Sequence, residues 1–352
     1  MAEKDAIWAL GCMSGTSMDG VDGAMILSDG VEVFEFGSTG FRPFTREETA
    51  NLAAGLGKWP GEDGVAGAAR IVETAHAELI ARFQGVELVG FHGQTLAHDP
   101  AGRGTHQVGN GDLLARETGL PVAWDFRTDD VAAGGQGAPL APFYHFALAR
   151  RFSLGRVAFL NLGGVGNITF VDPGVPRPED AGACLAFDTG PANALMDDLM
   201  RARTGLACDY GGALASCGHV CNEIKANFMQ AGYFAKSPPK SLDRNAFQGL
   251  LNSVSELGDA DALATLAAVA VASVLRAMAF SPFRPARVLV CGGGRKNDHL
   301  MAMLADELPI AVEKVERSGM DGDMLEAQAF AYLAARVKNG LPISGPGTTG
   351  VA

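Results

Sequence analysis

One short segment near the N-terminus limits the possible folds more than any other part of the chain. Residues 11–22 read Gly-Cys-Met-Ser-Gly-Thr-Ser-Met-Asp-Gly-Val-Asp, and apolar runs at 7–10 and 24–27 flank them. Apolar runs on both sides of a glycine-rich turn predict a strand, a tight turn and a second strand. Glycine lets backbone N–H groups approach an anion, and Ser and Thr add hydroxyl donors. The tip of this hairpin is therefore suited to phosphate, although an ordinary polar hairpin explains the same residues.

Two carboxylates belong to the same segment. Asp19 and Asp22 lie three residues apart, and carboxylate oxygens are ligands that Mg²⁺ and Ca²⁺ accept. We therefore expect these side chains to hold a metal ion or its bound waters.

A second glycine-rich turn opens the other half of the chain. Residues 156–171 read as a strand, a turn that contains Asn161, Gly163 and Gly164, and another strand. Two hairpins of similar build, one in each half, predict a duplicated architecture. We expect the two loops to contact phosphate from opposite sides of a cleft.

A third glycine turn is formed by Gly292, Gly293 and Gly294, after an apolar strand and before a helix start. It is suited to the adenosine end of a nucleotide. No Gly-x4-Gly-Lys-Ser/Thr sequence occurs, and the turn at 164–166 lacks the third glycine and the following helix of a dinucleotide fingerprint. The expected nucleotide loops are therefore hairpins.

Length and charge limit the class of protein. A chain of 352 residues exceeds a comfortable single core, so we expect two domains. Its net charge of −12 opposes nucleic acid or an anionic membrane as a partner. Residues 1–5 carry charges of both signs with no apolar segment behind them, so no secretion signal is expected. The longest uncharged apolar stretch, 262–275, is too short to cross a bilayer and predicts a buried core helix.

The cysteines suggest a reducing compartment. All six are scattered along the sequence, as expected for free thiols in the cytosol. Cys217, His219 and Cys221 lie close together, but their spacing matches none of the usual zinc pairs. We therefore expect no metal at this cluster.

Strand-like and helix-like segments alternate in both halves, and the Gly/Pro-rich stretch 133–142 interrupts the pattern. We expect an N-terminal domain of residues 1–135 plus about 325–352. The C-terminal domain would comprise about 136–324, with an irregular, Pro/Gly-punctuated insertion near 209–255 that serves as a lid or an interface.

Short motifs recur along nearly the whole chain. They are SGTSMDGVD at 14–22, FHGQT at 91–95, DFR at 125–127 with GGQGAPL at 134–140, NLGG at 161–164 with NIT at 167–169, FDTGP at 187–191, PPKS at 238–241 and CGGG at 291–294. Taken together they resemble the anhydro-N-acetylmuramic acid kinases, a branch of the superfamily that contains actin, hexokinase and the heat-shock ATPases. Gly166 and Ala192 depart from the family pattern, and neither touches a proposed catalytic group.

The resemblance implies an α/β fold: a two-domain actin-like ATPase (ribonuclease H-like) architecture with duplicated mixed sheets around a central cleft. It implies that water opens the 1,6-anhydro bridge of the murein sugar and that ATP phosphorylates O6. The product would be N-acetylmuramic acid 6-phosphate, made during recycling of cell-wall peptidoglycan. ATP and Mg²⁺ are the implied cofactors, a small-molecule anhydro sugar is the partner, and a cytoplasmic homodimer is the implied form.

The resemblance also assigns roles to single residues. The implied ATP and phosphate contacts are Gly15, Thr16, Ser17, Met18, Asp19, Gly20, Val21, Asp22, Asn161, Gly163, Gly164, Gly292, Gly293 and Gly294. Asp188 follows an apolar strand and would act as general base on the water that attacks C1. The implied sugar contacts are His92, Gln94, Arg127 and Glu326.

Several of these side chains also have a structural explanation. Asp188 can begin the helix that follows it, and His92 can be a satisfied core histidine. Arg127 can pair with a neighbouring aspartate instead of the lactyl carboxylate of the sugar. Glu326 lies three residues after Asp323, the spacing of a capping box.

Two other functions remain open on the residues alone. The phosphate loops would also suit a kinase of the same fold for another sugar. A sugar-sensing regulator that binds without turnover is the alternative from another class, although such regulators usually carry a DNA-binding helix-turn-helix, for which this acidic chain leaves no room before its first hairpin.

Overall fold

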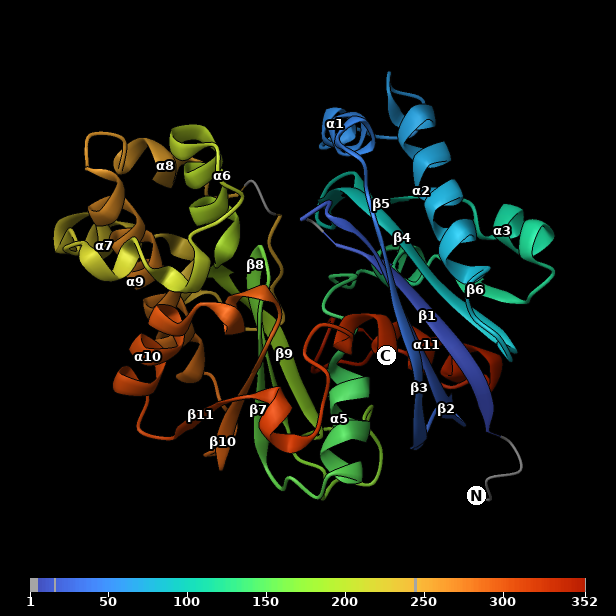
Figure 1. Ribbon diagram of the computed structural model, residues 1–352. Coiled ribbons are helices and arrows are strands. Elements are labelled where there is room, and N and C mark those ends of the chain that lie inside the picture. The colour runs from blue at the N-terminus through green and yellow to red at the C-terminus, as the bar shows by residue number, and fades with distance from the viewer. Residues whose placement is uncertain (1–5, 16, 244–245, 352) are drawn as a thin grey trace. The chain divides into compact units, whose positions relative to one another are not determined.

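The computed structural model describes residues 6–15, 17–243 and 246–351. The chain divides into two compact units (Figure 1). Unit 1 comprises Met1–Ser153, Val175–Ala183 and Met324–Ala352, and unit 2 comprises Leu154–Gly174 and Cys184–Asp323.

The sheet of unit 1 has six strands in the order β3-β2-β1-β4-β5, with β6 paired to β4 beside this path. Their bounds are β1 Ile7–Ser14, β2 Gly20–Ser28, β3 Val33–Pro43, β4 Leu88–Asp99, β5 Gly104–Val108 and β6 Val122–Trp124. β2 runs antiparallel to both β1 and β3, whereas β4 runs parallel to β1 and β6. The first expected hairpin is confirmed, because β1 and β2 enclose the glycine-rich turn.

Helices cover both faces of this sheet. They are α1 Arg46–Gly55, α2 Val65–Ile80, α3 Gly111–Thr118, α4 Thr128–Ala132, α5 Pro142–Arg151 and α11 Leu325–Lys338. α11 packs so closely on β1 that a Cβ added to Gly11 would lie 1.8 Å from the carbonyl oxygen of Ala327. Gly23 points to the opposite face, where Leu79 of α2 lies 3.0 Å from the position of its missing Cβ. Small residues on the strands thus set how closely the helices approach.

Unit 2 repeats the strand order of unit 1. Its five strands follow the order β11-β10-β7-β8-β9, with bounds β7 Val157–Leu162, β8 Val165–Val171, β9 Cys184–Pro191, β10 Arg287–Cys291 and β11 Ala311–Lys314. β8 is antiparallel to β7 and β9, whereas β10 is parallel to β7 and β11. Each unit therefore has an antiparallel meander followed by parallel strands. This topology confirms the duplicated mixed sheets of the expected fold class.

The core of unit 2 surrounds one apolar helix. The helices of this unit are α6 Asn193–Thr204, α7 Asn222–Phe228, α8 Gly249–Ser253, α9 Asp259–Met278 and α10 Asp298–Glu307. α9 packs with α6, α10 and the strands β7 to β10. It is long and apolar enough to cross a membrane, with a mean hydropathy of 1.6, but 72% of that window is buried within the protein. The expected buried core helix is confirmed, but at 20 residues it is longer than the stretch 262–275 from which its length was judged too short for a bilayer.

The insertion expected near 209–255 lies between α6 and α9. It contains α7, α8 and short 3₁₀ turns at Tyr210–Gly212, Ala215–Cys217 and Gly232–Ala235. Aromatic rings of this segment pack on one another, with Phe234 stacked on Phe247 at 6.0 Å.

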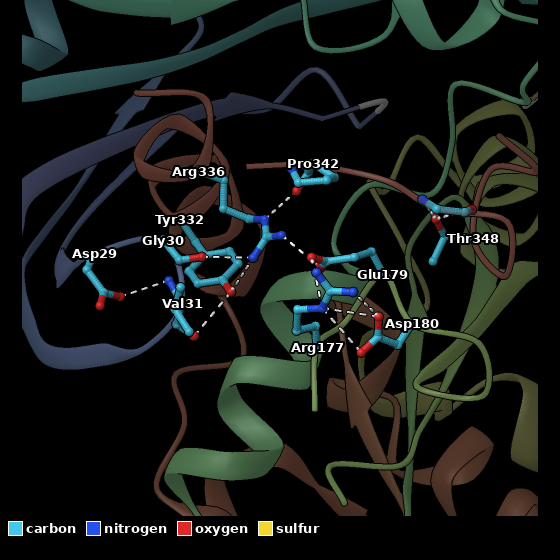
Figure 2. A network of polar contacts seen from close by, with 11 residues as sticks. Asp29, Gly30, Val31, Arg177, Glu179, Asp180, Tyr332, Arg336, Pro342 and Thr348 are labelled. Atoms are coloured by element: carbon cyan, nitrogen blue, oxygen red, sulfur yellow. Dashed lines mark hydrogen bonds and ion pairs between the residues drawn. The ribbon is translucent and has the colours of Figure 1, made fainter. Parts of the chain in front are cut away.

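The segment Val175–Ala183 leaves the sheet of unit 2 after β8 and groups with unit 1. Figure 2 shows its main anchor, the fully buried Arg336 of α11. Arg336 pairs with Glu179 at 3.0 Å and donates to the carbonyl oxygen of Gly30 at 2.9 Å. Within the segment itself, Arg177 pairs with Asp180 at 2.6 Å, and this ion pair is exposed.

The units are divided at positions that differ in part from the expected ones. Unit 1 continues past residue 135 to Ser153, because α5 packs into it: the Tyr144 hydroxyl donates to Gln328 at 2.8 Å, and Arg151 donates to the carbonyl oxygen of Val33 at 2.6 Å.

Candidate active site

The turn between β1 and β2 is held by its own backbone and by a neighbouring strand. The Met18 N–H donates to the Gly15 carbonyl at 3.1 Å, and Met18 adopts the left-handed φ of 53°. Ser17 Oγ donates to Asp19 Oδ1 at 2.6 Å. Gly20 begins β2, where a Cβ would lie 2.4 Å from the carbonyl oxygen of Arg42. Thr16 lies outside the described residues.

Gln94 connects β4 to this turn. Ser14 Oγ donates to Gln94 Oε1 at 2.5 Å, and Gln94 Nε2 donates to the Gly15 carbonyl at 3.2 Å. Both side chains are buried. The parallel pairing of β1 with β4 sets Ser14 opposite Gln94. Ser14 is the last residue of β1 and directly precedes the turn expected to bind phosphate.

The two aspartates of the turn differ in their surroundings. Asp19 is exposed, and Asp22 is half-buried within β2 opposite Met13. Among the described residues no group of three or more His, Cys, Asp or Glu side chains could hold a metal ion. One or two carboxylates suffice for Mg²⁺ only where phosphate oxygens and waters complete its shell. The donor set therefore fits Mg²⁺ bound together with a nucleotide.

His92, within β4, and Arg127, directly before α4, are hydrogen-bonded to each other. Arg127 donates from Nε and Nη2 to His92 Nε2 at 3.2 and 3.1 Å, and from Nη1 to the Gly137 carbonyl at 2.6 Å. His92 Nδ1 faces the Gly93 carbonyl at 2.9 Å. Burial, followed by the charge of Arg127, lowers the pKa of His92 well below its usual value. The imidazole is thus neutral, with its proton on Nδ1, and it orients the guanidinium.

The aspartates near Arg127 have partners of their own. Asp130 accepts bonds from the backbone N–H of Gly137 at 2.7 Å and from Ser344 Oγ at 2.7 Å. Asp125 accepts from Thr128 Oγ1 at 2.5 Å and holds a left-handed φ of 55°. Non-glycine residues rarely adopt this conformation, and those that do cluster at functional sites.

The two glycine turns of unit 2 lie against each other. A Cβ on Gly292 would meet Asn161 Oδ1 at 2.1 Å, and one on Gly294 would meet Leu162 at 2.5 Å. Backbone N–H groups at the start of α6 donate to the carbonyl oxygens of the turn at 163–164. Ala192 donates to Gly164 at 3.1 Å, Asn193 to Gly163 at 3.0 Å and Ala194 to Gly164 at 3.2 Å. The structure thus brings the turn expected at phosphate, with Asn161, Gly163 and Gly164, beside the turn expected at adenosine, Gly292 to Gly294.

Arg295 fixes the turn at Gly292 and was missed by the sequence analysis. It is buried, donates to the Gly292 carbonyl at 3.0 Å and pairs with Glu316 at 2.6 Å and Asp323 at 3.0 Å. Because Asp323 serves this pair, it forms no capping box with Glu326. α11 begins after Met324 without a side-chain cap, and Glu326 is exposed on its first turn.

Asp188 lies inside β9 and is buried. Its Oδ2 accepts the backbone N–H of Leu242 at 2.7 Å, and its own N–H donates to the Lys240 carbonyl at 3.1 Å. Tyr233 Oη donates to the Asp188 carbonyl at 2.5 Å. The structural alternative, a helix-start residue, does not apply, because α6 begins at Asn193.

Lys240 holds the segment that contacts Asp188. Its buried ammonium lies 5.4 Å from the ring centroid of Phe187, 4.6 Å from that of Tyr233 and 4.7 Å from that of Phe280, and it donates to the Tyr233 carbonyl at 3.2 Å. Burial lowers the pKa of Lys240, and the charges of Arg276 and Lys236 add to this. The motif PPKS signalled this segment, but only the fold places it beside β9.

The residues of the thiol cluster are hydrogen-bonded to the backbone of the insertion and to α9. Cys217 and His219 are exposed and Cys221 is half-buried. The His219 N–H donates to Asp261 Oδ1 at 2.7 Å, and Cys217 Sγ donates to the Ala213 carbonyl at 3.4 Å. These residues connect the insertion to α9.

The chain is similar over its full length to one group of proteins. The family model described as "Anhydro-N-acetylmuramic acid kinase" matches residues 7–352. A protein of that name from Cereibacter sphaeroides is 61% identical, over 100% of this chain and 95% of its own length. The protein of that name from Ruegeria sp. is 55% identical, over 100% of this chain and 94% of its own length.

Among solved structures, similarity shows the fold alone. Component A of (R)-2-hydroxyglutaryl-CoA dehydratase from Acidaminococcus fermentans superposes with a TM-score of 0.50 at 12% identity, over 95% of this chain and 99% of that one.

Proposed function

The chain belongs to the anhydro-N-acetylmuramic acid kinase family, and from that membership we propose its reaction. Water opens the 1,6-anhydro ring of N-acetylmuramic acid, and the γ-phosphoryl group of ATP is transferred to O6. The product is N-acetylmuramic acid 6-phosphate, and the protein serves the recycling of cell-wall peptidoglycan.

The observation that supports this chemistry best is the fixed carboxylate of Asp188. Its Oδ2 accepts the Leu242 N–H, and its backbone is tied to Lys240 on one side and Tyr233 on the other. A carboxylate held in one orientation is suited to act as a general base. In this reaction Asp188 takes a proton from the water that attacks C1.

The bonds that change are few. The water oxygen forms a bond to C1 and the bond from C1 to O6 breaks, so that O6 becomes a nucleophile toward the γ-phosphorus. The bond between that phosphorus and the oxygen bridging to ADP then breaks. The proton taken by Asp188 leaves with solvent, and the charge that develops on the phosphoryl oxygens requires donors around them.

Donors for the phosphates come from the glycine turns. In unit 1 they belong to Gly15, Thr16, Ser17, Met18, Asp19, Gly20, Val21 and Asp22, and in unit 2 they belong to Asn161, Gly163 and Gly164. Ser14 adds a hydroxyl whose orientation Gln94 fixes. The adenosine end lies at the Gly292 turn, which Arg295 holds in place.

Asp19 and Asp22 would hold Mg²⁺, directly or through water. Bound there with ATP, the ion would neutralise charge on the transferring phosphoryl group. Ser17 orients the carboxylate of Asp19, which is exposed and therefore accessible to the ion.

The sugar is held by side chains of unit 1. Arg127, oriented by His92, offers a guanidinium to the lactyl carboxylate, for which its planar fork is suited. Gln94 and Glu326 complete the contacts to sugar oxygens. The enzyme acts in the cytosol as a homodimer, which light scattering after gel filtration would test.

Incubation with ATP, Mg²⁺ and 1,6-anhydro-N-acetylmuramic acid in ¹⁸O-labelled water tests the proposal. Quenched before the anomeric oxygen exchanges, the product should carry ¹⁸O on C1 and none in the phosphoryl group. Label in the phosphate, or phosphorylation of an intact anhydro ring, would contradict the mechanism. A panel of other sugars separates it from a kinase of another substrate, and binding without ADP release would indicate a sensor.

A further inference from the structure

A cavity of about 190 Å³ lies in unit 1 where β4, β5 and β6 meet. Six of the residues that line it are Phe91, His92, Thr105, Gln107, Trp124 and Asp125, and we call it the Trp124 pocket. His92 and Asp125 border Arg127 in space and in sequence. The parallel pairing of β4 with β6 ends at Phe91 and Trp124, and both residues line the pocket.

Trp124 forms one wall of this pocket and is held in place from behind. It ends β6, opposite Phe91 of β4. A Cβ added to Gly111 would lie 2.2 Å from the indole ring, so glycine is required for the ring to lie where it does. The side chain remains 38% exposed, unusually for a tryptophan. A fixed, partly exposed indole offers a flat apolar surface with one N–H donor.

The pocket is also lined by polar side chains of β5, Thr105 and Gln107. Gln107 Nε2 donates to Thr105 Oγ1 at 2.8 Å and to Thr95 Oγ1 at 3.1 Å, which fixes the amide. Thr95 follows Gln94, the residue that bonds Ser14 of the phosphate turn. One strand, β4, thus contributes residues both to the pocket and to the contact with the turn assigned to phosphate.

The charge of the lining selects among ligands. Asp125 is the one aspartate or glutamate among the described residues that line the pocket, and no lysine or arginine is among them. A carboxylate repels an anion but accepts hydrogen bonds from hydroxyl or amide groups. An apolar platform beside fixed polar groups matches a neutral sugar ring, with C–H groups on its faces and donors at its edge.

We propose that the Trp124 pocket binds the neutral part of the pyranose ring, with Trp124 as its stacking surface, while the anionic lactyl group stays outside it toward Arg127. This inference rests on the proposed function, since it names which part of that substrate the pocket takes. Trp124 is thus a specificity residue for the ring, and Arg127 for its charged substituent.

Two sugars that differ in one group test the proposal: 1,6-anhydro-N-acetylmuramic acid and 1,6-anhydro-N-acetylglucosamine, which lacks the lactyl ether. Calorimetry measures Kd for both with the wild-type chain, Trp124→Ala and Trp124→Phe. Tyr210→Ala, which removes an aromatic side chain that is 70% exposed in unit 2, is the control. We expect Trp124→Ala to raise both Kd values by the same factor, about tenfold or more. Trp124→Phe should raise them about threefold, and Tyr210→Ala should leave them unchanged.

Fluorescence gives a second readout if Trp124→Ala does not fold. The chain has three tryptophans, and sugar binding should change the emission of the wild type but not that of Trp124→Phe. Persistence of the change in Trp124→Phe, unchanged Kd values, or a loss confined to the lactyl sugar would overturn the inference while leaving the kinase function intact. A wild-type chain that neither binds nor phosphorylates the anhydro sugar would instead contradict the proposed function, and the inference with it.

Discussion

The two units share one strand order but differ in where their histidines lie. Five of the seven histidines belong to unit 1, namely His76, His92, His98, His106 and His145. Burial lowers the pKa of His76 and of His98 to about 4 and that of His145 to about 3. Cations are buried in both units, Arg42 and Arg336 in unit 1 and Lys240 and Arg295 in unit 2. The same topology thus supports buried neutral imidazoles in unit 1, whereas in unit 2 His219 is exposed and His299 is half-buried.

This difference shows that the strand order does not determine the chemistry of a unit. In unit 1 neutral imidazoles orient a cation, as His92 orients Arg127. In unit 2 buried cations hold loops against the strands, as Lys240 does beside Asp188 and Arg295 does at Gly292. Function is therefore carried by what each loop places at the strand ends.

The largest expected effect concerns the chemistry assigned to unit 2. Asp188→Asn should lower kcat by about 10² to 10⁴, because a general base acts mainly in the transition state. ATP binding should stay within a few-fold of wild type, which calorimetry measures beside initial rates. The carboxylate-to-amide change keeps the size of the side chain. Near-wild-type turnover would remove Asp188 from the mechanism.

The second largest effect concerns Gly11, which lets α11 pack closely on β1 in unit 1. Gly11→Ala places a methyl group against the backbone of α11, so we expect a loss of about 3 kcal/mol in the free energy of unfolding. Gly67→Ala is the matched control, because nothing lies within 4 Å of its added Cβ. In helix α2 that change should be neutral or slightly stabilising. Equal melting curves for the two variants would show that α11 can move away at little cost.

The buried histidines predict that acid destabilises unit 1 before unit 2. The folded pKa of His76 is about 4, below the usual 6.5. The unfolded chain therefore takes up the proton first, and stability falls as the pH drops from 6.5 toward 4. This residue alone accounts for about 3 kcal/mol at the acid end.

Hydrogen exchange at pH 7 and pH 5 measures this difference. Peptides from α2 and β4 should lose protection at pH 5, whereas those from α9 and β9 should change less. His76→Leu should reduce the effect, since its ring Nε2 has no hydrogen-bond partner among the described residues. Uniform loss of protection across both units would contradict the comparison.

The smallest effect concerns the buried lysine of unit 2. Lys240→Met removes the bond to the Tyr233 carbonyl and the contact with three rings. We expect kcat/KM to fall about tenfold, because the segment that donates to Asp188 is loosened. Lys236→Met, at an exposed site four residues earlier, is the control. If Lys240→Met lowers the melting temperature but leaves kcat/KM at the wild-type value, the lysine serves stability alone.

The local sequence determined the elements and the glycine turns. Apolar runs around glycine predicted both hairpins, and an uncharged run between Asp261 and Arg276 predicted the core helix, because period and turn chemistry are properties of neighbouring residues. The order of the motifs along the chain was sufficient to indicate the family. The assigned roles of the site residues stay predictions until they are tested.

Only the tertiary structure decided which of these residues meet. Ser14 bonds Gln94, 80 residues away, because β1 and β4 pair in parallel. Trp124 faces its pocket because Gly111 leaves room behind it, and Asp323 serves Arg295 instead of capping α11. Long-range pairing, close packing at glycine and competition for a carboxylate depend on the whole fold, and no local pattern encodes them.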